Sequence, residues 1–445
     1  MSHATRLVRV DSLCVWPKYL RQSAVCSLLS RPGKECVHES QCLPWKSGGT
    51  AWQSVGRCRK NMQAPFRRRT LDCGRMLGPE LEASDSMKSA RIHAFTDNPD
   101  EIEVVDVAKP TPAAGQVRVR MLMSPVNPSD LNFLHGTYRQ ALERVVWNHG
   151  KNDPSQPVFY DPTLSNACPM PPYALGGEGV GIVDETGSGF LARRLLGRRV
   201  AIASGPPNGT WQEHTVVDAK RAVALPDAIS NEQGAMYFLN PITAYVLIRE
   251  VLHIPQGAWL LVTAAGSALG KSAVRLGKVY GFKTLCVVRG SANTQELRDM
   301  GADAVVETSN QNLQAEVFRI TQGKGVGYAM DCVGGELAAE VLRCLGLDGH
   351  MVLYGTLDKN PMPLTVRDLI MPVARVSGFL LPNWMTQQSP LKLLSVLRTA
   401  KKLTVQGVFA TEVAEVYALE QVADAVRAAP RLGRTGKVML RMASA

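Results

Sequence analysis

The sequence predicts an α/β fold in which a doubly wound parallel sheet is joined to an antiparallel β-barrel domain. Three observations support this. Residues 259–289 have the order strand, small-residue turn, helix, strand, which is half of a dinucleotide-binding βαβ unit. Strands and helices continue to alternate after Arg289. Short alternating strands separated by turn signals occur at 91–123 and at 176–225.

The βαβ unit starts with an apolar strand at 259–262, and an amphipathic helix is predicted over 271–280, ended by Gly281 before a strand at 284–288. Small residues in the turn let a pyrophosphate approach the amides at the helix N-terminus. Arg289 ends the second strand, where an arginine suits a 2′-phosphate, so we predict NADPH as the cofactor. The turn residues predicted to bind it are Gly266, Ser267, Ala268, Leu269 and Gly270.

Two other interpretations of this turn stay open. Ala264 stands where the first glycine of a Gly-x-Gly-x-x-Gly motif belongs. Gly270-Lys271-Ser272 resembles the end of a nucleotide-triphosphate loop, but the glycine needed five positions earlier is Ala265. The other open interpretation, besides a triphosphate loop, is an ordinary packing turn between a strand and a helix.

Composition is that of a globular protein, with 45% hydrophobic and 20% charged residues among 445. No apolar run approaches the length of a membrane helix, so we expect no membrane span. The net charge is +11, but residues 1–86 hold 14 Lys and Arg against 7 Asp and Glu. The remaining chain is nearly balanced, which argues against a nucleic-acid partner.

Residues 1–86 lack the periodicity of a domain, and we expect them to be a disordered basic leader. They hold six of the ten cysteines, without CxxC pairs or zinc spacing. Four basic residues against one acid in the first thirty positions resemble an organelle transit peptide. The alternative is that Met87 is the working start and the head is upstream translated sequence.

Three strands follow Met87. A hairpin is predicted from strands at 91–95 and 101–107 around the turn at 97–100, and residues 117–123 alternate as a third strand. Next come Asn127-Pro128-Ser129-Asp130 and then Gly136-Thr137-Tyr138. Here the chain resembles the zinc-free branch of the medium-chain dehydrogenase/reductase superfamily, and most of all its mitochondrial trans-2-enoyl thioester reductases. The resemblance implies that Tyr138 is the catalytic tyrosine, supported by Asn127 and Asp130.

The same resemblance covers Met87 to the C-terminus. It implies a GroES-like barrel with strands at 176–183, 199–203, 211–217 and 222–225, and a helix at 231–237 that leads to the cofactor domain. Beyond it we expect strands at 304–307, 326–333, 351–354 and 436–440 and helices at 313–321 and 420–429. The residues that the resemblance places near the cofactor are Asn240, Thr243, Tyr354, Gly355, Phe379, Leu381 and Lys437. Without it, the apolar run at 378–385 would be a core strand.

No metal is predicted. Catalytic zinc in the superfamily needs a cysteine near Ser129-Asp130 and a histidine where Gly177 stands, and the cysteines of a structural zinc lobe are missing.

Residues 139–175 make a longer connection than the family usually has. Residues 139–149 are predicted to form a short helix and the rest an extended loop. Such a loop acts either as a lid over the cleft or as a surface insertion without function.

These observations together predict a leader at 1–86, a GroES-like catalytic domain at 87–236 and 377–445, and an NADPH-binding Rossmann domain at 237–376. The predicted activity is NADPH-dependent reduction of the 2,3 double bond of trans-2-enoyl thioesters, of CoA or acyl carrier protein, in fatty acid synthesis. A homodimer in mitochondria is expected, with the cytoplasm as the alternative location. The functional alternatives are a zinc-free quinone or alkenal oxidoreductase, a non-catalytic NADPH-binding partner protein and, least favoured, a triphosphate hydrolase.

Overall fold

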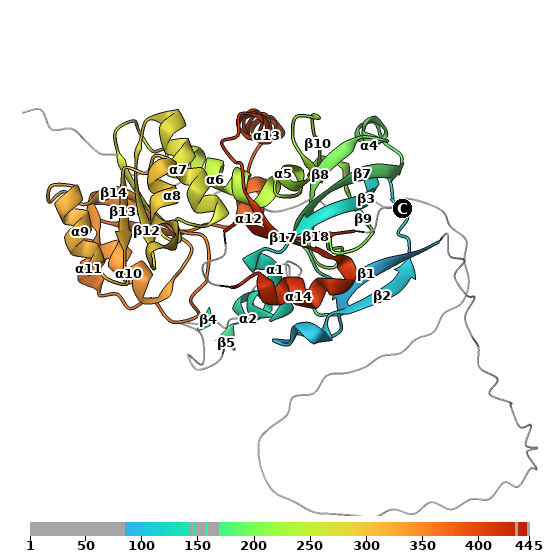
Figure 1. Ribbon diagram of the computed structural model, residues 1–445, viewed down its shortest axis with the longest axis horizontal. Helices are drawn as coiled ribbons and strands as arrows, with labels where there is room; N and C mark the ends of the chain where they lie inside the picture. Colours follow the sequence, from blue (N-terminus) through green and yellow to red (C-terminus); the bar gives the residue numbers. More distant parts are fainter. Residues whose placement is uncertain (1–84, 143–145, 148–156, 159–168, 432–434, 443–445) are drawn as a thin grey trace, which may run out of the picture. The chain divides into compact units, whose positions relative to one another are not determined.

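A six-stranded parallel sheet has the order β13-β12-β11-β14-β15-β16 in the computed structural model (Figure 1). The structure describes residues 85–142, 146–147, 157–158, 169–431 and 435–442. The strands are β11 Trp259–Val262, β12 Lys283–Val288, β13 Ala304–Glu307, β14 Val326–Asp331, β15 Leu345–Leu353 and β16 Arg375–Gly378. The chain order reverses between β11 and β14, which is the switch point of a doubly wound sheet. The predicted Rossmann-type sheet is therefore confirmed.

The helices that accompany this sheet are α7 Ala268–Tyr280, α8 Thr294–Asp299, α9 Leu313–Ile320, α10 Gly335–Arg343 and α11 Val366–Ile370. The predicted helix at 271–280 begins three residues earlier, because the Ser267 side chain caps it. Gly281 ends it in the left-handed conformation, with φ 75°. The predicted strand at 351–354 is longer in the structure and starts at Leu345.

A seven-stranded sheet forms the barrel domain. Its order is β10-β8-β7-β3-β18-β17, and β9 also pairs with β3. Its strands are β3 Gln116–Pro125, β7 Glu178–Thr186, β8 Arg199–Ala203, β9 His214–Asp218, β10 Ala222–Ala224, β17 Val413–Ala418 and β18 Lys437–Arg441. Strand β18 pairs antiparallel with β3, so segments from both ends of the described chain build this sheet, as expected.

A small sheet of order β2-β1-β6 contains the predicted hairpin. Its strands are β1 Ser86–Ile92, β2 Glu103–Ala108 and β6 Tyr173–Ala174. The first strand lies five residues earlier than predicted, because Ala90 and Ile92 are the residues that alternate into the core. A 3-10 turn, η1 Pro99–Glu101, stands in the predicted turn region.

The long connection after Tyr138 differs from its predicted helix at 139–149. Helix α1 Pro128–Leu134 precedes Tyr138, and the short helix α2 Thr137–Leu142 contains it. The strands β4 Val146–Trp147 and β5 Pro157–Val158 then pair antiparallel. The helix is therefore shorter than predicted and starts two residues earlier, after Gly136 turns the chain with φ 71°. Most of the predicted extended loop, 148–156 and 159–168, lies outside the described residues, as do residues 1–84 of the leader.

The remaining helical segments lie in the barrel domain or where the chain passes between the two domains, except η5, which lies between β12 and α8 of the parallel-sheet domain. They are α4 Phe190–Leu195, the 3-10 turns η2 Ala219–Arg221, η5 Ser291–Asn293 and η6 Leu419–Gln421, α5 Asn231–Ala235, the π-helical turns η3 Phe238–Ile242 and η4 Leu247–Val251, α6 Thr243–Val246, α12 Leu381–Thr386, α13 Pro390–Val405 and α14 Val422–Ala428. The reading of 378–385 as a core strand is wrong, since Gly378 ends β16 and α12 follows. Helix α13 was not predicted.

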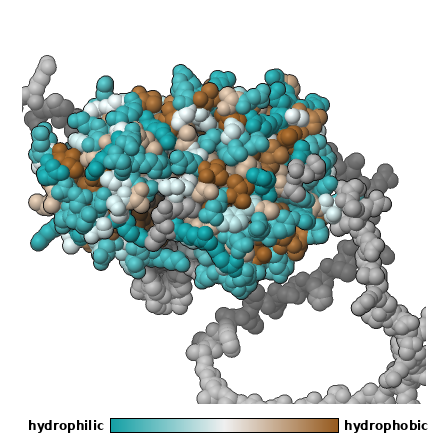
Figure 2. Space-filling view, in the orientation of Figure 1, coloured by the Kyte–Doolittle hydropathy of each residue, from teal (hydrophilic) through white to brown (hydrophobic). Residues whose placement is uncertain are grey.

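All described residues belong to one compact unit. One hydrophobic cluster contains Val180 and Met439 of the barrel together with Leu260 and Val262 of the parallel sheet. The face shown in Figure 2 is mainly hydrophilic, with hydrophobic surface in separate patches. No helix among the described residues is long and apolar enough to cross a membrane. The domain limits at 236/237 and 376/377 stay a prediction.

Candidate functional site

The turn between β11 and α7 is tightly packed. Ala264, at the first position of the glycine motif, adopts φ 46°, a conformation that favours glycine. The Ser267 hydroxyl accepts a hydrogen bond from the Gly270 amide at 3.1 Å. A Cβ added to Gly270 would lie 2.5 Å from the carbonyl oxygen and 2.6 Å from the Cα of Ala265. The backbone of this turn and the first turn of α7 therefore approach each other closely, as in a phosphate-binding turn.

Lys271 does not point to a triphosphate site. Its side chain is buried, and its ammonium donates to the Glu296 carboxylate in an ion pair. A triphosphate loop needs a lysine that reaches the β- and γ-phosphates. The structure therefore disfavours the triphosphate interpretation.

Arg289 directly follows β12, and its side chain is exposed. No carboxylate in the described part of the chain forms an ion pair with it. An exposed guanidinium at the carboxyl end of the second strand suits an anionic group on the ribose. Its role in binding a 2′-phosphate stays a prediction.

The carboxyl ends of β14 and β15 bring Tyr354 and Gly355 next to Cys332. A Cβ on Gly355 would lie 2.7 Å from the Cβ of Cys332. The Tyr354 hydroxyl is buried beside the Cys332 thiol, and burial raises its pKa. The Asn240 side-chain nitrogen, in the π-helical turn η3, is a buried donor with no hydrogen-bond acceptor among the described residues. Thr243, three residues on, begins α6.

Asp331, at the end of β14, was not foreseen as a site residue. Its carboxylate accepts from the Thr263 hydroxyl at 2.6 Å and from the Gly334 amide at 2.8 Å. These bonds tie the ends of β11 and β14 together at the switch point. The sequence signal for it was its place at the end of an apolar strand, directly before Cys332.

Phe379 and Leu381 lie near this edge of the sheet. The Phe379 amide donates to the Leu353 carbonyl at 2.8 Å. Leu381 is buried and belongs to the same hydrophobic cluster as Leu269 of the turn, with Tyr354 and Phe379 packed against it. The structure thus brings predicted cofactor residues from three separate segments into one cluster.

In the barrel domain, four polar side chains form a buried network. Asn127 is 3% exposed, Asp130 0%, Glu178 1% and Lys437 9%. The Asn127 side-chain nitrogen donates to Glu178 Oε1 at 3.0 Å, and the Lys437 ammonium donates to the Asn127 side-chain oxygen. The Asn127 backbone N–H donates to Asp130 Oδ2 at 2.8 Å, and this hydrogen bond caps α1. Lys437, expected near the cofactor phosphate, is therefore held against Asn127.

Glu178 connects this network to the start of the cofactor domain. Its Oε2 accepts from the Phe238 amide at 2.9 Å and from the Leu239 amide at 2.8 Å, just before Asn240. Sequence reasoning missed this residue. The available signal was an acid within a run of glycines, Gly176 to Gly181, where an unpaired charge would be costly.

Burial dominates the electrostatics of the two carboxyls. Burial, the largest effect, and the nearby charge of Glu178 together raise the pKa of Asp130 to about 7, while the Asn127 backbone amide and Lys437 oppose the shift. Burial likewise raises the pKa of Glu178, against the hydrogen bond from Leu239 and the charge of Lys437. At neutral pH this site can therefore hold or release a proton.

Tyr138 lies in α2, and its side chain is half-buried. Its ring packs edge-on against Phe133 of α1, with ring centroids 5.0 Å apart and an interplanar angle of 77°. Asn127 precedes the same helix α1, so the two predicted catalytic residues come from one local helical unit.

Gly177 stands where zinc-dependent members of the superfamily carry a histidine. A Cβ at this position would lie 3.2 Å from Asp130 Oδ1, so a larger side chain would displace Asp130. Within the described residues, no three His, Cys, Asp or Glu side chains converge as metal ligands.

Comparison with known proteins agrees with this architecture. Residues 113–227 match the family model "Alcohol dehydrogenase GroES-like domain", and residues 268–398 match "Zinc-binding dehydrogenase". The mitochondrial enoyl-[acyl-carrier-protein] reductase of Xenopus tropicalis is 31% identical over 62% of this chain and 72% of its own length. The Schizosaccharomyces pombe protein of the same name is 27% identical over 76% of this chain and 88% of its own.

Solved structures show the same fold. A putative NADPH:quinone reductase from Bacillus thuringiensis is 30% identical, with a TM-score of 0.70 over 80% of this chain and 99% of its own. The Escherichia coli quinone oxidoreductase, solved with NADPH, has a TM-score of 0.67 at 24% identity, over 80% and 99% of the two chains. On this evidence the chain belongs to the medium-chain dehydrogenase/reductase superfamily of oxidoreductases.

Proposed function

We propose that this oxidoreductase uses NADPH to reduce the 2,3 double bond of trans-2-enoyl thioesters. The observation that carries the proposal is the name shared by relatives at 26–31% identity, mitochondrial enoyl-[acyl-carrier-protein] reductase. Two structural observations support the same reaction: the buried network around Asn127, and the position of Tyr138 in α2, the helix that follows α1.

NADPH fits the residues present. Gly270 and Ala265 make a turn with no room for a side chain, which suits a pyrophosphate. Arg289 offers a cation that no described carboxylate neutralises, and no residue in the described ranges accepts a hydrogen bond from the buried Asn240 side-chain nitrogen. Together these groups would hold the pyrophosphate, the 2′-phosphate and the nicotinamide end.

NADPH supplies the hydride that reaches the β-carbon of the enoyl thioester. The protein has to stabilise the negative charge that develops on the thioester oxygen and to deliver a proton to the α-carbon. Tyr138 is the proposed donor, since a phenol with an ordinary pKa of about 10 holds its proton at neutral pH. Asn127, held by Glu178 and Lys437, is its proposed support.

We further propose a mitochondrial location, a thioester of CoA or acyl carrier protein as substrate, a role in fatty acid synthesis, and a homodimer. The names of the relatives support the first three. Around edge strand β16, the side chains of Val366, Ile370, Met371 and Val373 are more than half exposed, which supports a homodimer. Light scattering of the purified protein tests the dimer.

The experiment that tests the function is a screen of NADPH oxidation with short and long trans-2-enoyl-CoAs and with quinones, on the protein beginning at Met87. Enoyl-dependent oxidation with a saturated acyl product supports the proposal. Turnover of quinones alone contradicts it.

A quinone reductase is the second candidate. The putative NADPH:quinone reductase from Bacillus thuringiensis is 30% identical to this chain, and the match covers 99% of that protein. If NADPH binds with enhanced fluorescence but no acceptor oxidises it, the protein is a non-catalytic cofactor-binding partner.

A further inference from the structure

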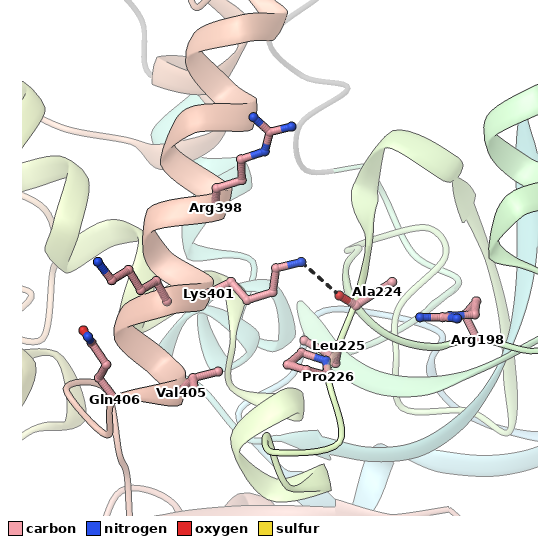
Figure 3. Close-up of a pocket in the computed structure, with 9 residues that line it drawn as sticks. Arg198, Ala224, Leu225, Pro226, Arg398, Lys401, Val405 and Gln406 are labelled. Atoms are coloured by element: carbon pink, nitrogen blue, oxygen red, sulfur yellow. Dashed lines mark hydrogen bonds between the residues drawn. The ribbon is translucent and has the colours of Figure 1, made fainter.

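A basic groove lies between helix α13 and the barrel strands β8 and β10 (Figure 3). Its volume is about 640 Å³. Arg398 and Lys401 extend from α13 on one side, and Arg198 and the Leu225-Pro226 segment form the other (Figure 3). The Lys401 ammonium donates to the Ala224 carbonyl at 3.4 Å across it. None of these residues belongs to the candidate functional site.

Helix α13 carries apolar side chains on two faces, although a helix packed on one side normally needs one apolar face, and the second face also holds Arg398 and Lys401. Val396, Ala400 and Leu403 are buried in the core. A second set of positions recurs at heptad spacing along another face, and Leu391 is 80% exposed, Leu394 42% and Val405 50%. The residues at these positions are Leu391, Leu394, Arg398, Lys401 and Val405. Spacing of three and four residues is what a partner helix requires.

The charges around the groove all have one sign. Arg198, Arg398, Lys401 and Lys402 line it, and no carboxylate in the described ranges lies within ion-pair distance of them. Lys392, at the start of the same helix, contrasts with these because it pairs with Glu250 at 2.6 Å. Four cations around an apolar floor attract an anionic partner that also carries apolar side chains.

We propose that this groove is a docking site for an acidic amphipathic helix of another protein. Apolar side chains of that helix would pack on Val405 and Pro226, and its carboxylates would pair with Arg198, Arg398 and Lys401. The leader of this chain is disfavoured as the occupant, because residues 1–86 hold twice as many basic as acidic residues. This docking proposal does not rest on the proposed reductase activity.

The lining of the groove favours a helix over an anionic membrane. Leu225, which lines it, is 5% exposed, and the lining residues lie along the side of α13 and on the barrel segment that faces it. A lipid surface would contact the outermost charges only, whereas a helix reaches both the charges and the floor.

The test uses a fluorescein-labelled synthetic peptide of about 20 residues, three heptads with leucine at two positions and glutamate at the flanking ones. Fluorescence anisotropy measures its binding to the full chain without substrate or cofactor. We expect saturable binding that weakens about tenfold when ionic strength rises from about 50 to about 300 mM. A peptide of the same composition in scrambled order should bind at least about tenfold more weakly.

The decisive variant is Arg398→Glu with Lys401→Glu, which should weaken binding about a hundredfold, because two attractions become repulsions. The matched control is Lys324→Glu with Lys359→Glu, two exposed lysines of the cofactor domain, which should leave binding unchanged. Arg398→Gln with Lys401→Gln should give an intermediate loss if the charge reversal disturbs folding.

Three results would overturn the proposal. These are equal binding of the ordered and scrambled peptides, equal binding by the two charge-reversed proteins, and no saturable binding at low salt. Sedimentation with vesicles containing phosphatidylserine is run in parallel. If the vesicles bind through Arg398 and Lys401 and the peptide does not, the surface is a membrane contact and the proposal is wrong.

Discussion

Tyr138 and Asn127 are placed by local structure, while their partners come from far along the chain. Phe133, five residues earlier, packs against the Tyr138 ring. Asn127 instead depends on Glu178 and Lys437, which are 51 and 310 residues away. A substitution at either site residue therefore tests chemistry, whereas a substitution at their partners tests positioning.

Replacing the Tyr138 hydroxyl should slow the proposed reaction without loosening the cofactor. Tyr138→Phe keeps the edge-on ring contact with Phe133 and removes only the proton donor. We expect kcat on crotonyl-CoA to fall by a factor on the order of 10² to 10⁴, with the NADPH KM nearly unchanged. Tyr328→Phe, on a strand of the cofactor sheet, is the control. Unaltered turnover in Tyr138→Phe would remove the tyrosine from the mechanism.

Arg289 should decide between the two nicotinamide cofactors. Arg289→Ala should raise the KM for NADPH about tenfold or more and leave that for NADH nearly constant, because only NADPH has a 2′-phosphate. Steady-state kinetics with both cofactors measure this. Equal changes for both cofactors would assign the arginine another role.

Asp130 should make stability depend on pH in an unusual direction. Its folded-state pKa of about 7 lies above the ordinary value of 3.8, so the folded protein binds the extra proton in this window. Stability from this group is therefore full below about pH 4 and declines as pH rises to about 7, by at most about 4 kcal/mol.

Urea unfolding of the wild type and of Asp130→Asn at pH 5 and pH 8 measures this effect. The asparagine keeps an oxygen for the Asn127 amide but cannot ionise. We expect the variant to lose less stability than the wild type between the two pH values. The exposed Asp227→Asn is the control and should follow the wild type. Parallel curves for Asp130→Asn and wild type would show that this carboxyl does not carry the dependence.

At the scale of elements, the turn before α7 is the part that local chemistry determines most fully. Strand β11 has its predicted limits, and the helix starts at a serine cap and ends at a left-handed glycine, as local preferences dictate. The first strand of the hairpin and the helix after Tyr138 were misplaced, because burial and the pairing of β4 with β5 outweighed local signals. Helix α13 was missed because its two apolar faces obscure a simple amphipathic period.

Gly270→Ala should disturb both this turn and cofactor binding. The added methyl would lie 2.5 Å from the Ala265 carbonyl oxygen, and backbone must move to relieve the contact. We expect a loss of about 1–3 kcal/mol in unfolding free energy and a higher NADPH KM. Gly290→Ala is the control, because its Cβ would meet no atom within 4 Å. If both variants behave alike in thermal unfolding and kinetics, close approach at Gly270 is unimportant.

At the scale of the whole molecule, one carboxylate joins the barrel network to the chain that enters the cofactor domain. Glu178 accepts from Asn127 on one side and from the Phe238 and Leu239 amides on the other. The shared hydrophobic cluster connects the same two sheets. Because Glu178 is buried, the loss of any of these hydrogen bonds would leave a polar group without a partner and destabilise the protein.

Glu178→Gln should weaken that connection. If the glutamine oxygen serves the two backbone amides, its NH₂ faces the Asn127 NH₂, and turning Asn127 over would point its NH₂ at the Lys437 ammonium. One donor then stays unpaired, so we expect a loss of about 1–3 kcal/mol together with a lower kcat. Glu316→Gln, which breaks only a surface pair with Arg319, should cost less than about 1 kcal/mol. Denaturant unfolding and turnover that are unchanged in Glu178→Gln would show the network to be dispensable.

The sequence by itself determined the α/β class, the βαβ unit with its turn and the place of Arg289 after the second strand. These depend on local periodicity, capping and small residues, which act over a few positions, whereas Asn127 and Tyr138 were singled out by the family resemblance. Only the tertiary structure decided that Lys437 contacts Asn127, that Glu178 links the two domains and that α13 leaves a basic groove. Those features arise from residues distant along the chain, and burial in a shared core, which no local pattern records, brings them together.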